Sequence, residues 1–146
     1  MVSITFSRAT TSWARAPSTA LTLAGFYAWW GSRIALRPAL LAFSLAALGL
    51  VCDFAGESLF IGWLPQPGTS LHRTASLLTG AAGNGLYTLA GIILTVATPS
   101  LPLRALAWLA WASGVALTVF TIIDVPAAVV ASSAALMILF TPWVAI

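Results

Sequence analysis

Two of the three carboxylates in the chain lie inside an apolar segment, CDFAGESLFIGWLP at residues 52–65. Asp53 and Glu57 are four residues apart, so a helix would place them on one face. Two carboxyl groups about 6 Å apart in a medium of low dielectric should not both be ionised. A pair that shares a proton suits proton uptake, cation binding or general acid–base chemistry. The pair therefore predicts a buried acidic pocket as the functional centre.

A second apolar segment, LLTGAAGNGLYTLAG, offers polar partners for this pair. Asp53 and Asn84 each lie eleven residues from the same end of their segments, so both should be roughly 16 Å deep. We expect the Asn84 amide to donate to the Asp53 carboxylate, with the Tyr87 hydroxyl beneath them. Small residues predict that the two segments meet closely, through Gly49 and Gly56 on one and Gly80 and Gly83 on the other.

A shallower group of polar residues is expected nearer the same end, formed by Glu57, His72, Arg73 and Asp124. These residues are candidates for binding a ligand or an ion together with Asp53. For the last three there is also a plain structural interpretation, as solvated turn or boundary residues. The chain has one histidine and one cysteine, which excludes a multi-histidine or cysteine-based metal site within one chain. No metal and no cofactor are predicted.

The composition defines the class of protein that must position these residues. Of 146 residues, 60% are hydrophobic and only 6% are charged, whereas soluble domains carry about 25% charged residues. Lipid is the natural solvent for so apolar a surface. All six basic residues are arginine, and the absence of lysine excludes a retinal Schiff base. The net charge of +3 comes from few, scattered arginines, so nucleic-acid binding is not expected.

The predicted fold is an all-α integral membrane protein with an antiparallel four-helix transmembrane bundle. Each span is close to the ~20 residues that cross a bilayer. The proline-rich segments LPQPGTSL and TPSLP and the turn at 124–126 separate the spans. Short connections make consecutive helices antiparallel neighbours. The spans are expected at about 39–64, 74–97, 104–123 and 126–146.

The first 37 residues form a separate, basic and aromatic-rich segment, and residues 38–146 form the membrane domain. Apolar residues recur at helical spacing over residues 18–36, but the uncharged stretch is short for a span. We expect an amphipathic helix lying in the membrane interface there, with a short fifth span as the alternative.

The placement of arginines predicts the orientation of the bundle. The N-terminal segment contains four arginines, and Arg104 lies in the loop between the second and third spans, on the same side. The opposite side has only Arg73. Because cytoplasmic loops are enriched in arginine and lysine, the N-terminus is expected in the cytoplasm.

Three classes of function are compatible with these features. The first is a carrier or binding protein for a proton, a cation or a small lipophilic ligand, acting through the Asp53/Glu57 pair. The second is a membrane-embedded enzyme that uses the same pair as general acid and base on a lipophilic substrate. The third is a non-catalytic subunit of a larger membrane complex. The expected partners are the lipid bilayer and either a second copy of the chain or other membrane subunits.

Overall fold

The computed structural model of the protein describes residues 33–63, 66–98, 100 and 103–144. Within these ranges all regular structure is helical and there is no strand. The elements are α2 (Leu36–Trp63), α3 (Ser70–Ser76), η1 (Leu77–Gly83), α4 (Asn84–Ala97), α5 (Arg104–Ile122) and α6 (Pro126–Val144). The predicted interfacial helix falls on residues 18–36, almost all of which lie outside the described ranges.

Local sequence explains where several helices begin and end. The Thr69 side chain accepts a hydrogen bond from the backbone N–H of His72 at 3.2 Å and so caps the start of α3. Pro126 opens α6, at the helix position where a missing N–H has no cost. After α5, Asp124 adopts a left-handed conformation with φ 59°, which aspartate tolerates better than most residues.

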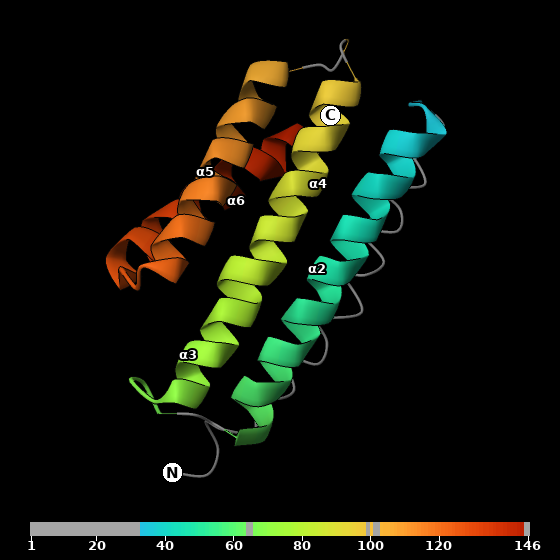
Figure 1. The fold of residues 1–146 in the computed structure, drawn as a ribbon. Helices are drawn as coiled ribbons and strands as arrows, with labels where there is room; N and C mark the ends of the chain where they lie inside the picture. The colour runs from blue at the N-terminus through green and yellow to red at the C-terminus, as the bar shows by residue number, and fades with distance from the viewer. Residues whose placement is uncertain (1–32, 64–65, 99, 101–102, 145–146) are drawn as a thin grey trace.

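α3, η1 and α4 follow one another without interruption and make one long rod, called here the central helix (70–97). α2 lies along one side of the central helix, and α5 lies along another (Figure 1). α6 turns back behind α5 and packs against it. α2 and α6 share no extensive contact, so the described helices are arranged in series rather than as a closed square bundle.

Two faces of the central helix contact different neighbours, and the core lies along these two interfaces. On the α2 side, Ala90 and Leu94 pack against Ala42 and Ala46. On the α5 side, the Trp111 indole packs directly against Gly91. A methyl group at position 91 would overlap the ring, so only glycine allows this contact.

The buried Trp111 indole also donates to the Thr95 hydroxyl at 2.8 Å, which links α5 to the central helix a second time. Its ring packs edge-to-face against Phe140 of α6, with centroids 5.8 Å apart. Small residues at both interfaces of the central helix therefore allow the close approach that is typical of membrane helices.

Three helices are long and apolar enough to cross a membrane: α2, the central helix and α5. This finding agrees with a membrane protein. The apolar part of α6 is shorter over its described residues, Pro126–Thr141, so a fourth span stays a prediction. The central helix begins at Ser70, earlier than the expected 74, because Thr69 caps it there.

Candidate functional site

Asp53 lies at the contact between α2 and the central helix. The Tyr87 hydroxyl donates a hydrogen bond to its Oδ2 atom at 2.7 Å. The Asp53 side chain is partly buried, and no described residue forms an ion pair with it. The structure thus brings together two of the residues singled out by the sequence, from segments 34 residues apart.

Glycines make room for the Asp53–Tyr87 pair on both helices. A methyl group at Gly83 would overlap the Asp53 Oδ1 atom, so the carboxylate lies against the bare backbone of the central helix. A methyl group at Gly49 would lie 2.9 Å from the Tyr87 ring and 3.0 Å from the Gly83 carbonyl oxygen. Asp53 therefore lies against Gly83 and the Tyr87 ring against Gly49, so the position of the pair depends on these two glycines.

The predicted bond between Asn84 and Asp53 is wrong. The Asn84 amide donates to the Gly114 carbonyl at 2.8 Å and to the Thr118 hydroxyl at 2.9 Å, both on α5. Both amide hydrogens are used in these bonds, so none is left for a carboxylate. The expected depth of Asn84 did not determine its direction: it follows Gly83 directly, and one residue rotates a helix by about 100°.

The predicted contact between Gly80 and α2 is also wrong. A methyl group at Gly80 would meet the Thr121 side chain of α5, with the nearest atom 2.8 Å away. Gly56 of α2 instead faces Ala75 and Thr79, where an added methyl group would approach within 2.9 Å of the Ala75 carbonyl. The other part of the expectation holds, because Gly49 and Gly83 do meet.

Glu57 is exposed on the surface of the single chain, so the expectation that both acids point into the bundle is wrong. A spacing of four residues in a helix turns the side chain by about 40°, which takes Glu57 to the edge of the contact face. Gly56 occupies the buried position beside it. Asp53 and Glu57 are thus neighbours of unequal burial, one inside the helix contact and one outside it.

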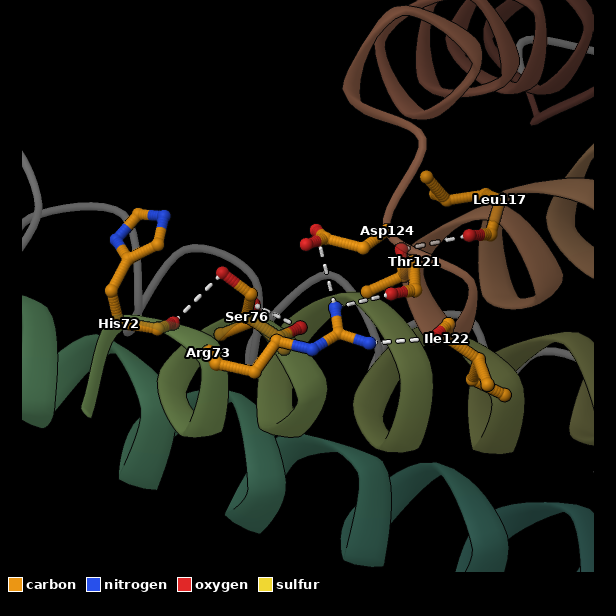
Figure 2. Close-up of polar contacts among 8 residues, drawn as sticks. His72, Arg73, Ser76, Leu117, Thr121, Ile122 and Asp124 are labelled. Carbon is orange, nitrogen blue, oxygen red and sulfur yellow. Dashed lines mark hydrogen bonds and ion pairs between the residues drawn. The ribbon is translucent and has the colours of Figure 1, made fainter. Parts of the chain in front are cut away.

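Arg73 and Asp124 form a second polar group, at the end of the molecule where α3 begins and α5 ends (Figure 2). The Arg73 guanidinium donates to the carbonyl oxygens of Thr121 at 2.6 Å and Ile122 at 2.5 Å. Carbonyls in the last turn of a helix have no partner within it, so Arg73 completes the end of α5. Its contact with the Asp124 carboxylate is longer, at 3.4 Å, and that carboxylate is 73% exposed. These contacts give Arg73 a structural role at the end of α5.

His72 lies apart from the Arg73 group in Figure 2. Its ring packs edge-to-face against Phe60 of α2, with centroids 5.5 Å apart, and its Nδ1 atom is buried without a hydrogen-bond partner. Among the residues that the structure describes, no three His, Cys, Asp or Glu side chains are placed to hold one metal ion. The predicted shallower group of polar residues therefore does not form one cluster. Arg73 contacts Asp124, His72 contacts Phe60, and Glu57 is exposed.

The structure adds a feature that the sequence did not reveal, the π-helix η1 (Leu77–Gly83). It ends at Gly83, against Asp53, and directly precedes Asn84. A π-helix has i→i+5 hydrogen bonds and a wider turn, and short π segments inside α-helices are frequent at functional sites. The only trace in the sequence is the glycine content of LLTGAAG, which suits close helix packing equally well.

Comparison with known proteins adds no relative from which a function can be carried over. No protein-family model matches the chain, and no curated protein or solved structure shows significant similarity to it. The chemistry of the contact between α2 and the central helix is therefore the basis for any statement about function.

Proposed function

We propose that the chain is a four-span membrane protein, with its N-terminus in the cytoplasm, that binds a proton or a small cation at Asp53. The observation that carries the proposal is the Asp53 carboxylate held between two helices of membrane length, with the Tyr87 hydroxyl as its hydrogen-bond donor. A single hydroxyl does not neutralise a partly buried carboxylate, and ionisable groups within membranes are costly and usually functional.

The distribution of positive charge supports the proposal. Arg73 is engaged by the end of α5 and by Asp124. The other described arginines lie near the starts of α2 and α5, whereas Asp53 lies in the second half of α2; they are Arg33, Arg37 and Arg104. Within the described ranges, then, no cationic side chain is placed to cancel a charge on Asp53, and that charge is left for a proton or a cation to balance.

The depth of the two acids gives this site a route to water. α2 has 28 residues and is thus about 42 Å long, about 6 Å longer at each end than a ~30 Å hydrocarbon layer. In a centred helix, Asp53 lies about 9 Å inside the hydrocarbon boundary and Glu57 about 3 Å inside it. The exposed Glu57 carboxylate can reach the headgroup region, so we propose that it passes the proton or cation between outer water and Asp53.

Infrared difference spectroscopy on the full chain in lipid vesicles tests binding at Asp53. We expect a carboxyl band that changes between acidic and alkaline buffer, or on addition of Na⁺, and that disappears in Asp53→Asn. Tyr87→Phe should shift this band, because it removes the hydrogen-bond donor of the carboxyl group.

Asp124→Asn is the matched control for this experiment. It removes an exposed carboxylate at the end of the molecule and should leave the band unchanged. A titrating carboxyl spectrum that is the same in wild type and in Asp53→Asn would refute the proposal. A second measurement, the decay of a pH gradient across the same vesicles, separates a carrier from a binding protein that does not transport.

A further inference from the structure

Three arginines lie at or just before the starts of α2 and α5, at the end of the molecule farthest from Glu57 and Asp124. Ile34, just before α2, packs against two hydrophobic clusters. One cluster contains Ala107 of α5, and the other lies between α2 and the central helix. The chain that leads into α2 is therefore fixed between α2 and α5. Arg33 directly precedes Ile34, and Arg104 lies one helical turn before Ala107, so both arginines are brought to the same end of this contact.

Among the side chains that the structure describes, the charge at this end is of one sign. Arg37 adds a third cation in the first turn of α2, and neither α2 nor α5 has an acidic residue in its first turn. The three carboxylates of the chain are Asp53, Glu57 and Asp124, and none of them lies at this end. A guanidinium has five N–H donors and matches a phosphate group with two parallel hydrogen bonds. It can therefore bind an anion while it keeps another contact.

The surface beside these arginines is apolar. Leu36, Leu40 and Leu103 are 70%, 54% and 50% exposed, although they flank the arginines at the starts of α2 and α5. A free anion such as inorganic phosphate gains nothing from contact with an apolar surface. A phospholipid matches both parts, since its phosphate lies at the membrane boundary and its acyl chains lie along the adjacent leucines. Arginines at this boundary attract anionic headgroups, by about fivefold in binding for each residue.

We propose that Arg33, Arg37 and Arg104 form a binding site for the phosphate group of an anionic phospholipid in the cytoplasmic leaflet. This inference rests on the membrane placement in the proposed function but not on any role of Asp53. Ile34 is the positioning residue of the site, because its packing holds Arg33 next to α5.

The test uses the full chain in vesicles and spin-labelled lipids, whose spectra report the fraction of lipid that the protein immobilises. We expect wild type to prefer phosphatidylglycerol over phosphatidylcholine, and Arg33→Gln and Arg104→Gln each to reduce that preference about fivefold. Ile34→Ala should also reduce it, with no change of charge. Ile123→Ala is the matched control and should not, because Ile123 is 57% exposed and lies at the opposite end of α5 from the arginines.

Several outcomes would overturn the proposal. An unchanged lipid preference in Arg33→Gln and Arg104→Gln would show that these arginines bind no lipid. An equal loss in Ile34→Ala and Ile123→Ala would show a diffuse attraction to the surface instead of a built site. Loss of the preference on adding millimolar inorganic phosphate, beyond that caused by chloride at equal ionic strength, would identify free phosphate as the ligand. Asp53→Asn should leave the lipid preference intact, so failure at Asp53 and failure here are distinguishable.

Discussion

Replacing Gly83 with alanine should disturb the candidate site through a single methyl group. The backbone of Gly83 is helical, with φ −58° and ψ −58°, so alanine suits the chain conformation there. The obstacle is the Asp53 carboxylate: an added Cβ would overlap its Oδ1 atom and lie 3.0 Å from its Cγ atom. The added Cβ would also lie 3.3 Å from the Gly49 carbonyl oxygen, so the α2 backbone limits any shift of the central helix toward α2 that would relieve the overlap. We expect the carboxylate to move and to lose its hydrogen bond with Tyr87.

Two opposing contributions determine how much Gly83→Ala changes the free energy of unfolding. Loss of the Tyr87–Asp53 hydrogen bond, which joins a hydroxyl to a carboxylate, costs about 1.5–3 kcal/mol. The higher helix propensity of alanine returns about 1 kcal/mol. We therefore expect Gly83→Ala to lower the free energy of unfolding by about 0.5–2 kcal/mol, as measured by denaturing-detergent titration in mixed micelles.

Gly85→Ala is the matched control, two residues along the same helix. A methyl group there would meet only the Thr118 side chain at an ordinary 3.5 Å, so the variant should be unchanged or stabilised by up to about 1 kcal/mol. A cycle with Tyr87→Phe isolates the mechanism: once Gly83→Ala has broken the hydrogen bond, Tyr87→Phe should cost little more. Fully additive losses, or equal stability of the Gly83→Ala and Gly85→Ala variants, would refute the reasoning.

The remaining predictions concern the neighbouring contacts and the topology. Arg73→Gln should lower the unfolding free energy by about 1–3 kcal/mol because two helix-end carbonyls lose a charged donor, whereas Asp124→Asn should cost less than about 1 kcal/mol because its contact is long and exposed. Equal losses from the two changes would contradict the capping role. Asn84→Ala should destabilise the protein by about 1–3 kcal/mol yet leave the titrating carboxyl band in place, since Asn84 bonds to α5. Single cysteines at positions 69 and 100, in a background without other cysteines, should react with impermeant reagents from opposite sides of the membrane. Labelling of both from the same side would contradict the predicted topology.

The sequence was sufficient to predict the helices that the structure describes between residues 36 and 144, because apolar composition and helix-breaking residues act locally. Proline, glycine and uncharged runs placed the helix ends within a few residues, except at Ser70, where the Thr69 cap was overlooked. The partners of each helix were harder to predict. Depth along a helix follows from counting residues, but the direction of a side chain depends on which neighbour lies there, and Asn84 was assigned to the wrong neighbour for this reason.

The parts of the site that sequence reasoning missed are those that depend on distant segments. Arg73 completes the end of α5 through a carbonyl 48 residues away, and no local pattern reveals that meeting. η1 lies against both α2 and α5, and its sequence reads as an ordinary glycine-containing helix. Glu57 was expected inside because four residues nearly complete a turn, yet the remaining 40° decided its exposure.

The polar contacts of the central helix are unequally divided, and this predicts which helix moves. Side-chain hydrogen bonds join the central helix to α5 at three levels, through Arg73, Asn84 and Thr95. Among the residues that the structure describes, one such bond joins the central helix to α2, from Tyr87 to Asp53. The rest of the described α2 interface is apolar and aromatic packing, such as Leu94 against Ala42 and Ala46 and His72 against Phe60. If a proton or cation at Asp53 displaces the Tyr87 hydroxyl, α2 should shift against a fixed unit of the central helix and α5. Spin labels at the exposed positions 58 and 74 should then change their separation with pH or Na⁺, and labels at 74 and 122 should not. Motion of the second pair alone would contradict this division.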